Sequence, residues 1–231
     1  MHLQSRPLVA MVLLAVALLS PLKIHAVEAN FYAELLSTYL AGMSTLSARF
    51  EQTTIDQSAY DTTTYGGQLW IEKPNRFRVD TVNPAIQTLV SNGTDFWSYD
   101  EDLEQVVISK LNTDLSEVPI LLFSSDIRDI QKAYNISGYS DERDESPLQE
   151  SRSLPPFLLE HFVLEPLSDL SLFQSLTLSF YLGKPVSITI NATTGETTTI
   201  SLYDIVLNSV MPAERFILVV PPGADVIDDR R

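Results

Sequence analysis

The sequence predicts an α+β protein built on a single strongly curved antiparallel sheet, with helices packed over its concave face. Short apolar runs separated by clusters of Pro, Gly, Asn and Thr recur along the chain, which is typical of successive antiparallel strands. We expect ten to twelve strands, about eleven in all, and two or three helices. The helical patterns fall near the start and in mid-chain, so they cannot alternate with strands as a parallel sheet requires.

The first residues have the pattern of a secretory signal peptide. Arg6 provides a positive start, a long apolar run follows it, and a small residue, Ala26, stands at a suitable cleavage point. The apolar run is too short to span a bilayer, which takes about 20 residues. We therefore expect a signal peptide over residues 1–26 and a single exported domain over residues 27–231. Cleavage after Ala29 is the alternative.

The remaining chain is strongly acidic and lacks cysteine. The full sequence has 15 basic and 30 acidic residues, and removal of residues 1–26 takes away Arg6 and Lys23, leaving a net charge of −17 (13 minus 30). Such a chain repels nucleic acid and anionic membrane surfaces. The absence of cysteine excludes disulfides, thiolate catalysis, cysteine metal sites and an N-terminal lipid anchor on cysteine.

Few residues in the chain could support catalysis. His161 is the only histidine after residue 26, and it lies in a strand pattern, FLLEHFVLE. No GxSxG nucleophile motif and no phosphate-binding glycine loop are present. We expect His161 to be an ordinary strand residue. The sequence predicts neither enzymatic activity nor a metal or cofactor site.

The first element after the signal peptide is an amphipathic helix. Leu36, Leu40 and Met43 recur at helical spacing over residues 30–46, and Gly42 predicts an end near Ser44. Alternation of apolar and polar residues then predicts a strand over 46–51. We expect a polar hairpin loop from Asp56 to Thr64.

Residues 65–100 are the stretch around which the rest of the chain is organised. They contain four apolar and aromatic runs, which predict four strands. Lys73-Pro74-Asn75, Asn83-Pro84 and Asn92-Gly93 separate the runs, and Asn-Gly is a strong hairpin signal. A fifth strand is expected over residues 104–111. We interpret this stretch as the wall of an apolar cavity.

The periodicity changes again after residue 116. Pro119 predicts the start of a short helix, a second follows Asp126, and a strand is expected over residues 135–139. Residues 140–155 are charged and predict a solvated loop. Further strand-like runs follow, separated by turn residues: 157–167, 175–185, 186–196, 197–209 and 214–223.

Patterning alone leaves two interpretations of the apolar surface open. The helix stripe at Leu36, Leu40 and Met43 and the apolar turn over residues 120–123 both need a partner face. In one interpretation the sheet and the helices enclose an ordinary filled core. In the other the two layers are separable and enclose a cavity for acyl chains.

The organising stretch resembles a known family. The motifs are G-x-L-W-I-x-K-P-N-R-F-R, then N-P, L-V-S-N-G, F-W-S-Y-D and L-E-Q-V, together with the tail PAERFILVVPPGADVIDDRR. Together they resemble the LolA family of periplasmic lipoprotein carriers, over nearly all of residues 30–231. The resemblance implies an incomplete β-barrel covered by a helical lid, with an apolar cavity between them.

The resemblance also implies a function without catalysis. Members of the family accept acylated lipoproteins from an ATP-driven inner-membrane release complex, carry them through the periplasm and deliver them to an outer-membrane receptor. We accordingly expect a soluble, monomeric periplasmic chaperone that binds no nucleic acid. Each acyl methylene kept from water contributes about 0.8 kcal/mol, so a lipoprotein cannot cross water unaided.

The resemblance suggests roles for particular residues. The family has an arginine before the proline of the strand turn that latches the lid, and here that position is Lys73. The alternatives are a weaker latch at Lys73 or a latch displaced to Arg76 or Arg78. Phe77 matches an aromatic residue that contributes to the contact with the inner-membrane complex. From alternation and position, we expect these residues to line the lipid-binding cavity: Leu40, Met43, Phe50, Leu69, Ile71, Val79, Leu89, Trp97, Ile120 and Leu122.

Three other functions are weighed against the carrier. The outer-membrane receptor of the same pathway shares the fold but needs a lipidated cysteine, which this chain lacks. A related periplasmic lipid- or lipoprotein-binding module, such as a glycolipid carrier or a stress sensor, is the main alternative. An exported hydrolase is the third, and the missing catalytic motifs speak against it.

Overall fold

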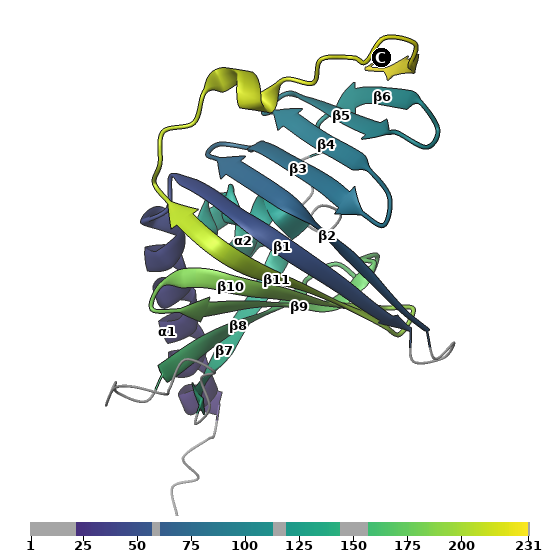
Figure 1. The fold of residues 1–231 in the computed structure, drawn as a ribbon. Helices are drawn as coiled ribbons and strands as arrows, with labels where there is room; N and C mark the ends of the chain where they lie inside the picture. Colours follow the sequence, from purple (N-terminus) through teal and green to yellow (C-terminus); the bar gives the residue numbers. More distant parts are fainter. Residues whose placement is uncertain (1–21, 57–60, 113–118, 144–156, 231) are drawn as a thin grey trace, which may run out of the picture.

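A computed structural model describes residues 22–56, 61–112, 119–143 and 157–230 of the chain. Within these ranges a twelve-stranded sheet curls around two α-helices and a short 3-10 helix on its inner side (Figure 1). The helices are α1 (Leu22–Ala41), η1 (Pro119–Phe123), α2 (Ile127–Ala133) and η2 (Ala213–Phe216). The strands are β1 (Thr45–Asp56), β2 (Asp61–Glu72), β3 (Arg76–Asn83), β4 (Gln87–Asn92), β5 (Asp95–Asp100), β6 (Gln105–Lys110), β7 (Tyr134–Arg143), β8 (Phe157–Pro166), β9 (Phe173–Tyr181), β10 (Lys184–Ala192), β11 (Glu196–Leu207) and β12 (Asp225–Asp229).

The sheet is open, with β12 at one edge and β7 at the other. The strand order is β12-β6-β5-β4-β3-β2-β1-β11-β10-β9-β8-β7. Neighbouring strands run antiparallel, whereas β12 and β6 run parallel. The curved antiparallel sheet with helices on its concave side confirms the predicted fold class, and the four strands predicted within residues 65–100 are β2 to β5.

Two boundaries near the start of the chain differ from the prediction. Helix α1 ends at Ala41, two to three residues earlier than expected, because Gly42 already leaves the helix. The loop expected from Asp56 to Thr64 is shorter, because β2 begins at Asp61 and its threonines pair with the end of β1. Residues 57–60 of that loop lie outside the described residues.

The strand predicted over residues 214–223 is not present in the structure. The strand expected over residues 214–223 is instead η2 followed by irregular chain that crosses the outer face of the sheet (Figure 1). Phe216 is 0% exposed, and the Arg76 guanidinium lies 4.6 Å from the centre of its ring. Arg215 lies 4.4 Å from the ring of Trp70 in the same way. Burial of the Phe216 ring therefore fixes this segment, which does not pair as a strand.

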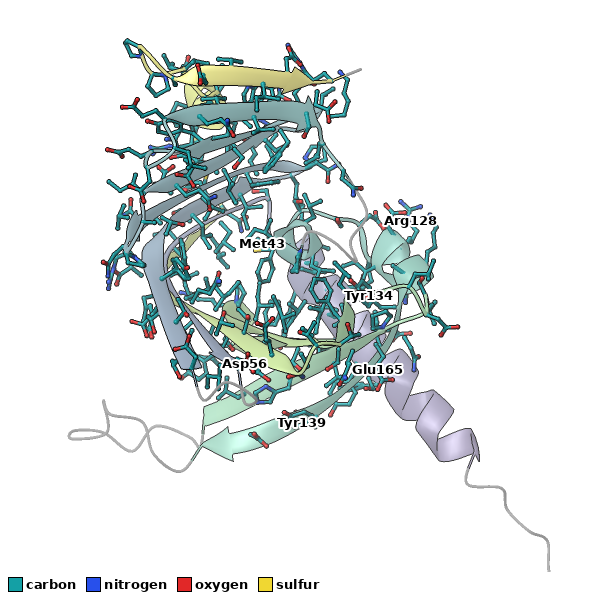
Figure 2. The ribbon with its side chains drawn as sticks, turned by 90° about the vertical axis from the view of Figure 1, so that its right-hand side faces the viewer. Met43, Asp56, Arg128, Tyr134, Tyr139 and Glu165 are labelled. Atoms are coloured by element: carbon teal, nitrogen blue, oxygen red, sulfur yellow. The ribbon has the colours of Figure 1, made fainter. Side chains whose placement is uncertain are left out.

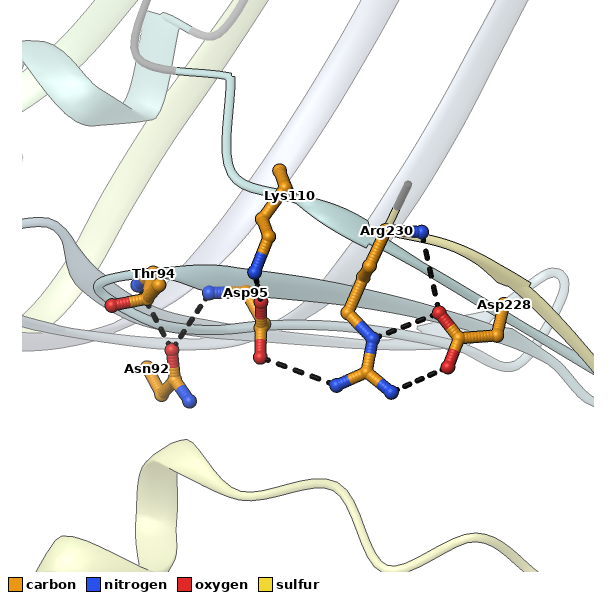
Figure 3. Close-up of polar contacts among 6 residues, drawn as sticks. All are labelled: Asn92, Thr94, Asp95, Lys110, Asp228 and Arg230. Carbon is orange, nitrogen blue, oxygen red and sulfur yellow. Dashed lines mark hydrogen bonds and ion pairs between the residues drawn. The ribbon is translucent and has the colours of Figure 1, made fainter.

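The last strand, β12, covers the outer edge of β6. Arg230 pairs with Asp228 on its own strand, and its guanidinium lies 3.4 Å from the carboxylate of Asp95 on β5 (Figure 3). Lys110 of β6 lies 3.1 Å from the same carboxylate. The unpaired edge on this side is therefore β12 itself, a five-residue strand with three aspartates, and short charged edge strands resist pairing with other chains.

The helical layer, which we define as α1, η1 and α2, fills one half of the concave face. Leu36 and Leu40 of α1 are buried against Phe162 of β8 and Phe180 of β9 within one apolar cluster, and Phe123 of η1 joins them. Met43 lies inside the curl of the sheet, between this layer and the strands (Figure 2). Half of the interior is therefore an ordinary packed core.

Candidate binding cavity and its latch

A cavity of about 940 Å³ occupies the other half of the concave side. It lies between the wall formed by β1 to β6, the inner face of β10 and β11, and η1. This volume is at the upper end of the range of about 300–1,000 Å³ that is usual for small-molecule sites. The apolar and aromatic side chains of its wall are Phe50, Leu69, Phe77, Val79, Ala85, Leu89, Phe96, Leu111, Pro119, Ile120, Phe173, Ile190, Ala192 and Ile200.

The strand residues of this set share the inner face of the sheet, because successive side chains of a strand point to opposite faces. Val79 pairs with Leu69 on β2 and with Leu89 on β4, so the three side chains stand in a row across the inner face. The wall also needs a glycine. A Cβ at Gly67 would lie 2.0 Å from the Asp80 carbonyl oxygen, so only glycine permits this close approach of the strands.

The wall is polar at both ends: Ser109, Lys110 and Asn112 line it near the end of β6, and a larger polar group lies at the other end. The side chains there come from the strand ends near the β1–β2, β3–β4, β5–β6 and β10–β11 turns. Their hydroxyl, amide and carboxylate groups belong to Gln52, Tyr65, Thr81, Gln87, Asp100, Glu196 and Thr198. The cavity can therefore take an amphipathic ligand, with an apolar part against the aromatic wall and a polar part toward these turns.

Lys73 joins the wall to the helical layer. Its Nζ donates a hydrogen bond of 2.6 Å to the backbone oxygen of Leu40 in the last turn of α1. Its backbone N–H donates to the oxygen of Ser44 at 3.0 Å. Burial lowers the pKa of Lys73, and the nearby carboxylate of Asp126 opposes this shift. The ammonium group thus sits between the end of α1 and the start of α2.

Asp126 caps helix α2 next to this lysine. Its Oδ1 accepts hydrogen bonds from the backbone N–H of Arg128 at 2.9 Å and from the Arg128 side chain at 3.0 Å. These bonds, with a smaller contribution from Lys73, lower the pKa of Asp126 to about 2. The cap satisfies a backbone donor that the first turn of a helix leaves without a partner.

A second contact holds α1 against the sheet further from the cavity. The hydroxyl of Tyr39 donates a 2.6 Å hydrogen bond to Glu160 on β8. Burial and this bond raise the pKa of Tyr39. The helix is therefore fixed to both halves of the sheet, through Tyr39 on one side and Lys73 on the other.

The sequence matches a known protein family over most of its length. The model of the family described as "Outer membrane lipoprotein carrier protein LolA" matches residues 41–218. This chain belongs to the LolA family. An outer-membrane lipoprotein carrier protein of Pseudomonas paraeruginosa is 37% identical over 194 residues, covering 84% of this chain and 86% of the relative. One from Chromohalobacter salexigens is 30% identical over 195 residues, covering 84% and 86%.

A solved structure shares the fold of this chain. An uncharacterized conserved protein from Thermus thermophilus has a TM-score of 0.53 at 12% identity, covering 85% of this chain and 98% of that chain. Within the described ranges, no helix has the length and apolar character needed to cross a bilayer. Nor do the described residues contain a cluster of His, Asp or Glu that could hold a metal ion.

The residues expected in a LolA-type cavity divide into two groups. Phe50, Leu69, Val79, Leu89 and Ile120 lie on the cavity wall. Four others are buried in the filled core beside the helical layer instead: Leu40, Met43, Ile71 and Leu122. The two interpretations left open by the sequence both apply, because one half of the interior is filled and the other half is hollow.

The assignment of Trp97 to the wall is wrong by one residue. Its neighbour Phe96 lines the cavity, and Trp97 pairs with Val90 and Ile108 on the opposite face of the sheet. Successive side chains of a strand point to opposite faces, so an error of one position places a side chain on the wrong face of the sheet. The pairing of Phe96 with the small Ser91 and Ser109 gave no apolar signal from which its face could be read.

Phe77 is buried on the inner face of the sheet. It is 2% exposed, lines the cavity and lies 6.1 Å from Phe96 between ring centres. Its contact with the inner-membrane complex stays a prediction. Its position follows from the same inner-face alternation as Val79.

His161 lies on the outer face, away from the cavity. Its Nδ1 is 2.9 Å from Ser179 Oγ, its ring stacks on Tyr139 at 4.6 Å, and its Nε2 is 3.5 Å from Asp141. Although Ser, His and Asp are adjacent here, Ser179 is 5% exposed within a strand, and none of the three lines the cavity wall. The arrangement offers a nucleophile no substrate site next to it.

Proposed function

We propose that this protein is a periplasmic carrier of acylated lipoproteins. It accepts them when an ATP-driven inner-membrane complex releases them, and it delivers them to an outer-membrane receptor without catalysing a reaction. The observation that carries the proposal is the 940 Å³ cavity with its wall of apolar and aromatic side chains, in a chain of the LolA family. The carrier begins after Ala26 and forms one domain, so the first residues of α1 are removed with the signal peptide.

The physical requirement is to cover acyl chains and still release them. Burial of each methylene contributes about 0.8 kcal/mol, so several chains bound in a fixed cavity would be held too tightly for transfer. A lid that closes on its own core lowers the affinity, because only the open fraction of the protein binds ligand. The helical layer is suited to this role, since it already packs against half of the concave face.

The two groups of expected cavity residues fit the two states of such a lid. Phe50, Val79 and Leu89 line the cavity that exists in the closed state. We propose that Leu40, Met43, Ile71 and Leu122 become part of the wall when the helical layer lifts away from β1 and β2. Lys73 is the latch of the closed state through its bond to Leu40.

The test is release of a lipoprotein from the membrane. Inner-membrane vesicles that contain the release complex and a labelled triacylated lipoprotein are incubated with residues 27–231 and ATP, then sedimented. We expect labelled lipoprotein in the supernatant, bound to the protein. Val79→Asp, which places a carboxylate on the apolar wall, should abolish this release, whereas Trp97→Ala on the opposite face should retain it. Lipoprotein that stays with the vesicles under all conditions would refute the proposal.

A further inference from the structure

Helix α1 is joined to β1 by a short connection whose backbone groups need partners. The helix ends at Ala41 and β1 begins at Thr45, so residues 42–44 form the connection. Gly42 N–H donates to Thr38 O at 3.1 Å, and Met43 N–H donates to Leu40 O at 3.2 Å. The last carbonyl groups of an α-helix have no partner within the helix, so they must find one elsewhere.

Asn208, the residue after β11, bonds the connection itself from 164 or more residues away in the sequence. Its Nδ2 donates to the Gly42 backbone oxygen at 2.9 Å. Its Oδ1 accepts from both the backbone N–H of Ser44 at 2.8 Å and the Ser44 hydroxyl at 2.9 Å. One amide side chain therefore holds both ends of the connection.

The backbone at Asn208 is shaped for this contact. Its φ is 58°, the left-handed region that asparagine tolerates better than most residues. Its N–H donates to Thr45 O at 3.0 Å, and the Thr45 hydroxyl donates to Ser209 O at 2.8 Å. The side chain is thus presented from the fixed ladder between β11 and β1.

The two anchors of α1 differ in rigidity. Lys73 holds Leu40 through one ammonium on a flexible four-carbon stem. Asn208, although exposed, holds Gly42 and Ser44 through a short amide that makes three hydrogen bonds. Loss of the single Lys73 bond therefore leaves three side-chain bonds between the connection and the sheet.

We propose that Asn208 is the pivot of the lid: it fixes residues 42–44 to the sheet, and α1 turns about them when the Lys73 latch opens. This inference rests on the proposed carrier function. Asn208 acts as a positioning residue, because it sets where Leu40 O meets Lys73 and does not touch the cavity wall. Without it residues 42–44 can shift on the sheet, so Leu40 O meets Lys73 less often; this weakens only the closed lid, which has the latch bond, and the open, ligand-binding fraction rises.

The side chain can be removed without backbone strain. Glycine adopts positive φ freely, so Asn208→Gly deletes the amide and keeps the local conformation. Asn208→Asp is the second variant, since it keeps an acceptor for Ser44 and loses the donor to Gly42. Asn191→Ala is the matched control, because that amide bonds to Ser175 on the outer face, far from α1.

The first measurement is the affinity of the protein for a fluorescent long-chain fatty acid. We expect Asn208→Gly to bind it about 3- to 10-fold more tightly than wild type, Asn208→Asp to be intermediate, and the control to be unchanged. A merely structural role would lower the thermal midpoint without raising affinity, and that result would overturn the proposal. If wild type binds no fatty acid, the carrier function itself fails, and the pivot fails with it.

Hydrogen exchange separates the pivot from the latch. In Lys73→Leu, amides of α1 should exchange faster while the Ser44 amide keeps its protection to within about twofold. In Asn208→Gly, the Ser44 amide should lose about tenfold or more of its protection, since its acceptor is gone. Equal acceleration of Ser44 and α1 in Lys73→Leu would show that residues 42–44 are not a pivot.

Discussion

Replacement of the latch lysine should make the carrier bind acyl chains more tightly. Lys73→Leu removes the 2.6 Å bond from Nζ to the Leu40 oxygen, and leucine cannot donate a replacement. A hydrogen bond to a charged group contributes about 1.5–3 kcal/mol. Leucine also avoids the cost of burying an ammonium, which already lowers the pKa of Lys73, so we take the net loss of closure energy as about 1–2 kcal/mol.

That loss converts to a measurable affinity. A change of about 1–2 kcal/mol corresponds to roughly a 5- to 30-fold shift of the equilibrium between closed and open lid. Because the closed lid competes with the ligand, the dissociation constant of a fluorescent fatty acid should fall by up to that factor. The variant should also retain bound lipoprotein and transfer it poorly to an outer-membrane receptor.

The control for this variant is Lys184→Leu, a change at an exposed lysine in the β9–β10 hairpin that has no part in the lid contact. It should bind the fatty acid and transfer lipoprotein as wild type does. Wild-type affinity together with normal transfer by Lys73→Leu would refute the latch, even if the variant were less stable.

The remaining expectations concern stability, pH and the two faces of the sheet. Phe216→Ala should lower the free energy of unfolding by about 3–5 kcal/mol in urea titration, because it empties a buried site on the outer face. Hydrogen bonds from Arg128 lower the pKa of Asp126 from 3.8 to about 2, so its contribution to stability is present above pH 3.8 and is lost as the pH falls toward 2. In Asp126→Asn the thermal midpoint should therefore change less with pH over this range than in wild type. Val79→Asp should weaken fatty-acid binding by about tenfold or more, because it places a carboxylate on the apolar wall, whereas Trp97→Ala should leave binding within about twofold, as fluorescence titration can show.

The strands and turns were predictable because their signals are local. Asn92-Gly93 and Lys73-Pro74-Asn75 carry turn chemistry in the residues themselves, and both stand between paired strands in the structure. The position of Lys73 beside α1 followed from the family resemblance, and the bond to Leu40 is present.

The sequence did not predict contacts between residues that lie far apart in the chain. The face occupied by Phe96 and Trp97 is decided by pairing with β4 and β6, and both residues are aromatic, so alternation was uninformative. The packing of Phe216 on the outer face depends on Arg76, far upstream. Asn208 carries no local signal, because its partners are at the opposite end of the chain.

Photo-crosslinking from adjacent positions tests the cavity most directly. A photoreactive phenylalanine is placed at position 96 or at position 97, and each protein is loaded with a labelled triacylated lipoprotein and illuminated. Phe96 lines the cavity and Trp97 lies on the opposite face, so we expect a crosslink to the lipoprotein from position 96 and none from position 97. Crosslinks of equal yield from both positions, or from position 97 alone, would contradict transport of acyl chains inside the cavity.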